Sequence, residues 1–332
     1  AGSEGKVKNN PLFKDKIILA QNITTKDNIG TGRLGVVKEC NIKGDTTPYA
    51  CKIVKDKDQE GLEKELDFLL NPKLIHENII ELIYYSTDPI TLIFMKCETD
   101  LDHYKINTIQ EAKEIWTGIA KGCLKLTQNK IVHYDLACRN ILLCTVDGKQ
   151  IPKICDFENS QNIASGDIIV SADQIYDYPF KYVEQLFAFY NYTIRKEYYI
   201  CSMCDIFSFG LLLFQSLFDI VQSTSVKIPL FFALSDDYSE EHAYDYDKIK
   251  SMIDGLNEAP DNSILNVIIM NWENKLSLQE KFNPLFKQKS MDSLLSICFS
   301  HLDYQEVSND EYIKKWESII VGIEQLPLTV EP

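Results

Sequence analysis

The stretch IVHYDLACRNILL, residues 131–143, places an aspartate and an asparagine five residues apart between two apolar runs. Asp135 is a candidate base that orients a hydroxyl nucleophile. Asn140 and Asp156, the latter in CDFEN, carry oxygen donors of the kind that hold Mg²⁺ together with waters and phosphate oxygens. Each residue alone is more common as a helix cap or a turn residue. Their order along the chain favours phosphoryl transfer.

A glycine pattern near the N-terminus could approach phosphate. Gly30, Gly32 and Gly35 fit G-x-G-x-x-G, and Val37 follows two residues later. Glycines on a strand–turn–strand let backbone N–H groups approach phosphate oxygens without obstruction by Cβ. A Rossmann loop leads into a helix, whereas VVKECNI here continues as a strand. A glycine-rich hairpin without a ligand is the alternative interpretation.

Lys52 stands in the apolar segment YACK, seventeen residues after Gly35. An ammonium in a buried strand is costly unless it is paired. The next predicted helix offers three glutamates, and Glu65 fits best because Phe68 and Leu69 can anchor that helix face inward. A Lys52–Glu65 pair would hold the ammonium against phosphates. A surface lysine is the alternative interpretation of Lys52.

The elements that must position these residues can be read from hydrophobic periodicity. The first hundred residues alternate like strands, with one helical interruption in DQEGLEKELDFLL. NIIELIYYS and ITLIFMKC predict two strands joined by a Thr-Asp-Pro turn. IQEAKEIWTGIAKGCLKLTQN is amphipathic, short strands flank VDGK, and IFSFGLLLF predicts a buried helix. We expect an α+β fold, with a small antiparallel-sheet lobe before a larger, mainly helical lobe. The expected parts are a leader at 1–20, the first lobe at 21–97 and the second at 98–332, with an insertion within 222–290.

Composition narrows the classes of partner. The chain has 332 residues, 45% hydrophobic and 25% charged, which is ordinary for a soluble globular protein. No apolar run reaches the roughly 18 residues of a membrane helix, and the first ten residues lack the apolar core of a secretory signal. The net charge of −15 argues against a nucleic-acid backbone as partner. We therefore expect a cytoplasmic protein with no nucleic-acid partner and no membrane insertion.

Ten cysteines without a signal peptide predict free thiols in a reducing cytosol, not a disulfide framework. CSMC, residues 201–204, is the only C-x-x-C pattern in the chain. A zinc site usually requires a second such pair or histidines at suitable spacing, and neither follows. We expect buried thiols at these positions.

Taken together, residues 20–325 resemble the eukaryotic protein kinase family. The glycine pattern resembles the glycine-rich loop, and HYDLACRN resembles the catalytic loop H-R-D-L-x-x-x-N. Other motifs with counterparts in the family are Ala50-Cys51-Lys52 of strand three, Glu65 of helix C, Asp156-Phe157 of Asp-Phe-Gly, and Asp205 at the start of helix F. The resemblance implies a bilobal kinase fold, ATP and Mg²⁺ as cofactors, and transfer of the γ-phosphate to a protein hydroxyl.

The same resemblance implies a nucleotide site. It suggests Val37, Ala50 and Leu142 around adenine. Phe94 takes the gatekeeper position, and Met95 to Cys97 form the hinge whose backbone would bind adenine. Cys97 and Cys155 would then flank the adenine and metal regions.

The residues between Asp135 and Asn140 bear on the substrate. Leu-Ala-Cys-Arg is similar to the Leu-Ala-Ala-Arg of tyrosine kinases and differs from the Lys-x-x pattern of most serine/threonine kinases. The resemblance gives Arg139 a role at the transferring phosphate or the substrate hydroxyl. YPFKYVEQL is also similar to the Pro-x-Lys/Arg-Trp segment of tyrosine kinases. Tyrosine is favoured, and serine or threonine stays open.

Several positions depart from the family pattern. Tyr134 replaces the arginine that receives an activation-loop phosphate, and Glu158 replaces the glycine after Asp156-Phe157. The Ala-Pro-Glu motif is degenerate around Glu184. The chain has three arginines, Arg33, Arg139 and Arg195, and candidate acceptors in the loop are Ser171, Tyr176 and Tyr178. Without a cationic receiver, activity should not depend on activation-loop phosphorylation.

These departures leave two hypotheses. The main one is an active ATP- and Mg²⁺-dependent protein kinase, because Lys52, Glu65, Asp135, Asn140 and Asp156 are all present. The alternative is a pseudokinase, a nucleotide-binding or empty scaffold that acts through regulatory protein partners. Glu158 and the degenerate motifs favour the alternative.

Overall fold

The structure is a computed structural model that describes residues 16–31, 36–54, 59–166, 168–171, 197–222, 289–298 and 308–328. Contacts divide the chain into two compact units. One comprises Ala1–Tyr104 with Cys138–Ser160, and the other comprises Lys105–Ala137 with Gln161–Pro332. The first unit thus combines most of the strand-rich part of the chain with the later segment that carries Asn140 and Asp156. Most of the predicted leader and of the predicted insertion lies outside the described residues.

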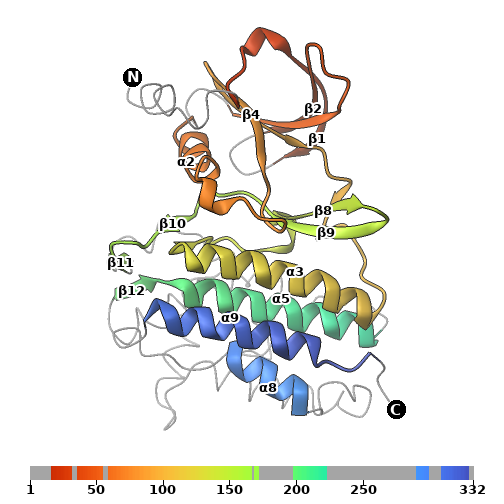
Figure 1. Ribbon diagram of the computed structural model, residues 1–332, viewed down its shortest axis with the longest axis vertical. Helices are drawn as coiled ribbons and strands as arrows, with labels where there is room; N and C mark the ends of the chain where they lie inside the picture. Colours follow the sequence, from red (N-terminus) through yellow and green to blue (C-terminus); the bar gives the residue numbers. More distant parts are fainter. Residues whose placement is uncertain are drawn as a thin grey trace, which may run out of the picture. The chain divides into compact units, whose positions relative to one another are not determined.

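The first unit contains a five-stranded antiparallel sheet in the order β1-β2-β3-β5-β4 (Figure 1). Its strands are β1 (Ile23–Thr31), β2 (Val36–Ile42), β3 (Tyr49–Ile53), β4 (Leu82–Thr87) and β5 (Ile90–Met95). They coincide with the segments whose apolar alternation predicts strands. Cys40, Cys51 and Ile93 belong to a buried cluster of this sheet. The sheet therefore holds β3, which carries Lys52, between two neighbouring strands.

Helix α2 (Gln59–Leu69) packs against β5. Leu62, Leu66 and Leu69 recur at helical spacing and are buried. Burying each of them contributes about 1.5–3 kcal/mol, and this fixes the rotation of the helix. Glu65 lies on the same face and is therefore directed inward.

A second, three-stranded sheet of the first unit has the order β6-β8-β9. Its strands are β6 (Thr99–Asp100), β8 (Ile141–Val146) and β9 (Lys149–Ile154). Asp147 and Gly148 both have positive φ, 51° and 78°, as a two-residue hairpin turn of the Asp-Gly type requires. The Asn78 side chain donates to the Pro152 carbonyl at 3.0 Å, and Ile154 N–H donates to the Asn78 carbonyl at 2.9 Å. These bonds fix the strand that leads to Asp156.

The second unit is mainly helical. Its helices are α3 (Ile109–Gln128), α5 (Ser202–Gln222), α8 (Lys289–Cys298) and α9 (Asn309–Glu324). Its short strands are β7 (Ile131–Val132), β10 (Gln161–Asn162), β11 (Ile168–Ser171) and β12 (Glu197–Ile200), and β7 pairs with β10 as β11 does with β12. The chain also forms the 3₁₀ turns η2 (Ala20–Asn22), η4 (Pro72–Leu74) and η5 (Cys138–Asn140).

Helices α3, α5 and α9 lie side by side in Figure 1 and meet through three aromatic residues. The ring of Phe209 lies 5.5 Å from that of Trp116 and 5.3 Å from that of Trp316, both edge to face. All three side chains are fully buried, and each such pair contributes about 0.5–1.5 kcal/mol beyond its burial. IFSFGLLLF is the buried helix that its composition predicts.

Side chains satisfy helix ends in this unit. The Thr108 hydroxyl accepts from Glu111 N–H at 3.1 Å at the start of α3. Lys113 Nζ donates to the carbonyls of Glu324 and Leu326, at 2.8 and 2.6 Å, at the end of α9. These bonds occupy backbone groups that a helix end leaves open. Among the described residues, no helix is both long and apolar enough to span a membrane.

Candidate active site

Lys52 is the centre of a buried charge cluster in the first unit. Its Nζ lies 2.7 Å from Glu65 Oε2 and 3.3 Å from Asp156 Oδ1. The side chains of Lys52 and Glu65 are only 9% and 2% exposed, so this pair is shielded from water. Burial by itself lowers the pKa of Lys52, but the two carboxylates outweigh it and hold the pKa above its ordinary value. Lys52 is therefore charged.

Glu65 joins α2 to the segment that follows β9. Burial raises the pKa of Glu65, while the Lys52 ammonium and the Phe157 N–H act against that rise. A contact of 2.7 Å to an ammonium is the geometry of a charged pair, so we treat the Glu65 carboxylate as ionised. The Phe157 ring is fully buried and lies 6.3 Å from the ring of Phe68. The pairing expected from the sequence thus forms, and the helix that supplies it also packs on the Asp156 segment.

Asn140 and Asp156, the predicted metal ligands, both lie in the first unit. Cys155 N–H donates to the Asn140 carbonyl at 2.9 Å, which joins the two residues through the backbone. Asp156 has φ 66°, a left-handed conformation that costs an ordinary residue about 1–2 kcal/mol. Mg²⁺ is usually held by one or two protein side chains plus waters and substrate phosphates. This pair of oxygen-bearing side chains, next to a lysine, fits Mg²⁺ with a nucleotide.

The residues expected around adenine occupy neighbouring strands. Ala50 stands opposite Phe94 in the β3–β5 pairing, and Val37 stands opposite Lys52 in the β2–β3 pairing. The structure places Leu142 in β8 and leaves Met95 46% exposed at the end of β5. Gly30 is in β1, whereas Gly32 and Gly35 lie outside the described residues. The roles of these residues in binding stay predictions.

In the second unit, Asp205 of α5 anchors the backbone that leads to Asp135. Its carboxylate accepts from His133 N–H at 2.8 Å and from Tyr134 N–H at 3.0 Å. Burial raises the pKa of Asp205, and His133 with the two N–H donors opposes that rise. Asp135 N–H donates to His133 Nδ1 at 3.2 Å. Asp135 itself is 6% exposed, so its position is set by buried hydrogen bonds.

Comparison with known families agrees with this arrangement. The family model described as "Protein kinase domain" matches residues 23–257, which is more than half of the chain. The chain belongs to the protein kinase family. The resemblance to the protein kinase family is therefore confirmed at the level of the domain, together with an antiparallel N-terminal sheet and helices.

Curated relatives of this kinase domain are distant. Cysteine-rich receptor-like protein kinase 26 of Arabidopsis thaliana is 32% identical over 146 residues, which cover 40% of this chain and 21% of that protein. The leukocyte tyrosine kinase receptor of Mus musculus is 26% identical over 163 residues, 43% of this chain and 18% of that protein. Putative cysteine-rich receptor-like protein kinase 30 of Arabidopsis thaliana is 25% identical over 219 residues, 61% of this chain and 30% of that protein. The chain thus spans less than a third of the length of these relatives.

Two further predicted features of the kinase domain are described by the structure. Arg139 is exposed in η5. Glu158 is only 8% exposed. After Glu65 and Asp156, its charge adds to the raised pKa of Lys52. Burial lowers the pKa of Lys64, and the charge of Glu158 opposes that lowering. A third carboxylate therefore adds to the negative surroundings of Lys52. Glu184, Arg195, Tyr176 and Tyr178 lie outside the described residues.

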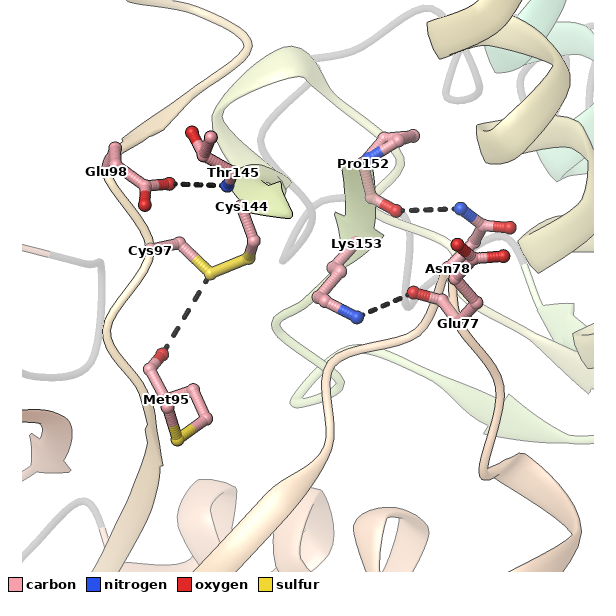
Figure 2. The surroundings of a disulfide bond; sticks show 9 residues. All are labelled: Glu77, Asn78, Met95, Cys97, Glu98, Cys144, Thr145, Pro152 and Lys153. Atoms are coloured by element: carbon pink, nitrogen blue, oxygen red, sulfur yellow. Dashed lines mark hydrogen bonds between the residues drawn. A yellow bond between two sulfur atoms is a disulfide. The ribbon is translucent and has the colours of Figure 1, made fainter. Parts of the chain in front are cut away.

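The prediction that all cysteines are free thiols is wrong for one pair. Cys97 and Cys144 form a disulfide, as Figure 2 shows. Eight other cysteines form no disulfide, among them the buried Cys201 and Cys204 of CSMC and the half-buried Cys155. Spacing did not reveal the pair because 47 residues separate it and only strand pairing brings it together. Cys144 is the one member that the sequence analysis did not consider for the site.

Proposed function

We propose that this kinase domain transfers the γ-phosphate of ATP to a protein hydroxyl in a Mg²⁺-dependent reaction. The observation that carries the proposal is the buried Lys52–Glu65–Asp156 cluster, with distances of 2.7 and 3.3 Å from the Lys52 ammonium. An ammonium held between two carboxylates stays charged, and a fixed positive charge is what a nucleotide phosphate requires.

Each candidate residue has a defined task in this proposal. Lys52 orients phosphate oxygens, and Glu65 fixes Lys52. Asn140 and Asp156 hold Mg²⁺, which when bound neutralises charge that develops on the phosphates. Asp135 orients the acceptor hydroxyl, and Arg139 meets the transferring phosphate or the hydroxyl. Asp205 is a positioning residue, because it holds the backbone before Asp135 without being assigned a contact to substrate.

Tyrosine is the favoured acceptor, with serine or threonine as the alternative. The support is Leu-Ala-Cys-Arg between Asp135 and Asn140, and a relative that is named a tyrosine kinase receptor. The other relatives named above are receptor-like protein kinases, and those names specify no acceptor residue. We further propose a cytoplasmic location and a protein substrate. Independence from activation-loop phosphorylation is part of the same proposal.

Transfer of radiolabelled phosphate tests the reaction. The parent should label a tyrosine-containing peptide more than a serine/threonine peptide, as phosphoamino-acid analysis would show. Asp135→Asn should lower transfer by at least about a hundredfold, because a base or orienting carboxylate acts in the transition state. Its nucleotide affinity should stay within twofold of the parent. Asp102→Asn, at an exposed position, is the matched control and should transfer normally. Full activity in Asp135→Asn would show that the catalytic loop is misassigned.

Binding is tested separately by thermal unfolding. Mg²⁺ with ATP should raise the melting temperature, whereas ATP without Mg²⁺ should not. At a hundred times its Kd, a ligand specific for the folded state stabilises by about 2.7 kcal/mol. Asp156→Asn should remove the response, because one of the two proposed metal ligands loses its charge. No response from the parent at millimolar nucleotide and Mg²⁺ would refute nucleotide binding.

A pseudokinase is the second candidate, and Glu158 is the observation that favours it. Its buried carboxylate lies in the electrostatic surroundings of Lys52, where phosphate would also have to bind. A domain that binds nucleotide without transfer, or binds none, would act through protein partners. Labelling and thermal unfolding together distinguish the enzyme from both forms of scaffold.

A further inference from the structure

The disulfide between Cys97 and Cys144 joins two segments of the first unit. Cys97 lies two residues after the end of β5, and Cys144 lies within β8 (Figure 2). Their Cα atoms are 4.6 Å apart, inside the range that disulfides span. Both residues are half-buried, so small thiols and disulfides in solution can reach them. Cys40 and Cys51, another close pair of cysteines in this unit, are fully buried.

Backbone pairing holds this pair together independently of the sulfur–sulfur bond. Thr99 stands opposite Leu143 in the β6–β8 pairing. Glu98 directly precedes β6, and its carboxylate accepts a hydrogen bond from Thr145 N–H at 2.8 Å. The two cysteines are next to these contacts in the sequence, since Cys97 precedes Glu98 and Cys144 lies between Leu143 and Thr145. Because these contacts do not require the bond, the two thiols stay adjacent after reduction, and the bond can form again.

The disulfide links the two segments expected to contact adenine. Met95 to Cys97 form the expected hinge, and Leu142 lies two residues before Cys144 on the same side of β8. Cys97 Sγ also lies 3.9 Å from the Met95 carbonyl oxygen, as Figure 2 shows. A disulfide sulfur has no hydrogen to donate, whereas the reduced thiol can donate to this carbonyl. Reduction therefore breaks the covalent link between the hinge and β8, and it adds a hydrogen-bond donor next to the Met95 carbonyl.

We propose that Cys97 and Cys144 are a reversible thiol–disulfide site through which small disulfides and thiols set the nucleotide affinity of the kinase domain. The proposal rests on the nucleotide binding proposed above. The oxidised form binds more tightly, because its hinge is already fixed to β8 and its Met95 carbonyl has no competing thiol donor. Fixing a binding segment beforehand lowers the ordering that the ligand must impose.

The chemistry is a two-step exchange with a low-molecular-weight disulfide. The thiolate of one cysteine attacks a sulfur of the small disulfide, forms a mixed disulfide and releases one small thiol. The second cysteine's thiolate then attacks the protein sulfur of that mixed disulfide and releases the second small thiol. The protein loses two electrons and two protons, and the small disulfide gains them. Reduction by two small thiols is the reverse.

The test uses the full chain in glutathione buffers of graded reduced-to-oxidised ratio. Alkylation and mass spectrometry give the fraction of Cys97–Cys144 disulfide, and calorimetry with Mg²⁺ and a non-hydrolysable ATP analogue gives Kd in each state. We expect Kd to be about three- to tenfold lower in the oxidised form, as loss of one preorganised segment would give. Thermodynamic linkage then requires a saturating concentration of the analogue to shift the thiol–disulfide equilibrium constant by the same factor. A tenfold factor shifts the midpoint potential by about 30 mV towards more negative values.

Variants separate this pair from other thiols. Cys97→Ser and Cys144→Ser should each remove the redox dependence of Kd, and Cys138→Ser, at another half-buried cysteine, should keep it. The midpoint shift is measured on the parent, so the test stands even if a variant fails to fold. Equal Kd in both states with an unmoved midpoint would overturn this proposal and leave nucleotide binding intact. Thiols that stay unpaired in oxidised glutathione would also overturn it. No nucleotide binding in either state would overturn both proposals.

Discussion

Lys52 and Glu65 form a buried ion pair whose atoms lie 2.7 Å apart, with side chains 9% and 2% exposed. Such a pair positions an ammonium more than it stabilises the fold, because removing two charges from water offsets much of their attraction. Removing one partner has a different result, since the other charge stays buried. Substitution of either residue should therefore destabilise the folded domain, whether or not the domain is catalytically active.

Lys52→Met should lower the free energy of unfolding by about 3–5 kcal/mol near pH 8, because it leaves Glu65 and Asp156 without their cation. Burial then raises the pKa of Glu65 further above its unfolded value. When the pKa of Glu65 is higher in the folded state than in the unfolded state, the loss of stability grows as pH rises from the unfolded pKa to the folded pKa. The difference from the parent should therefore shrink towards pH 5. Urea unfolding at several pH values measures it.

Lys96→Met is the control for that substitution. Lys96 pairs with Glu39 at 3.4 Å, but the two side chains are 36% and 26% exposed. Exposed pairs contribute about 0–1 kcal/mol, so this variant should unfold nearly as the parent does at every pH. Equal losses in the two lysine variants would mean that the burial of Lys52 carries no energetic weight.

Much of this arrangement could be predicted from the sequence. Periodicity identified β2 to β5, α2 and α3, because each buries one regular face. Glu65 was distinguishable from Glu60 and Glu63 because neighbouring apolar residues fix the rotation of α2. A local pattern is sufficient here, because the apolar residues that set the direction of Glu65 lie on the same helix.

Contacts between distant segments could not be predicted in the same way. The Cys97–Cys144 pair depends on β6–β8 pairing across 47 residues, and composition pointed to free thiols instead. Asp205 was recognised as a family landmark, but its bonds to His133 and Tyr134 depend on how α5 packs within its unit. Hydrophobic periodicity does not specify which separate segments pair or in what register. It therefore predicts neither the disulfide nor the hydrogen bonds of Asp205.

Asp205→Asn should destabilise the domain by about 1–3 kcal/mol, because an amide NH₂ would then face a backbone N–H that now donates to a carboxylate. The left-handed Tyr134, at φ 66°, depends on this support. Chemical unfolding monitored by tryptophan fluorescence measures the loss. Asp310→Asn, at an exposed position in the first turn of α9, should cost less than about 1 kcal/mol. Similar losses in both variants would contradict an anchoring role for Asp205.

Glu158→Gln should strengthen binding of Mg²⁺ and ATP about three- to tenfold, which corresponds to removing one carboxylate from the surroundings of Lys52 at an effective dielectric near 20. The side chain keeps its size, so packing around its buried position should change little. Calorimetric Kd values for parent and variant measure the effect. Glu60→Gln, on the exposed start of α2, is the matched control and should leave Kd unchanged. Weaker binding in Glu158→Gln would show that this carboxylate supports the site.

Activity should not require phosphorylation of the activation loop. A phosphate adds about −1.5 to −2 charges and orders a loop when a cationic side chain receives it. Tyr134 occupies the family position of that arginine, is only 7% exposed, and is held through its backbone by Asp205. A phenol at this position supplies no positive charge to a phosphate.

Part of the loop is already held by backbone pairing without a phosphate. Strand β11 pairs with β12 from Ile168 opposite Ile200 to Ser171 opposite Glu197. This ladder joins residues 168–171 of the loop to the segment just before α5, so part of the order of the loop comes from backbone hydrogen bonds. The expected result follows: phosphatase-treated protein, shown by mass spectrometry to be unmodified between residues 156 and 184, should transfer phosphate at an initial rate within a fewfold of the untreated protein. The assay must follow initial rates on a peptide, so that autophosphorylation cannot restore the loop. A drop of more than tenfold that rephosphorylation reverses would refute the prediction, and would require a cation other than the missing arginine to receive the phosphate.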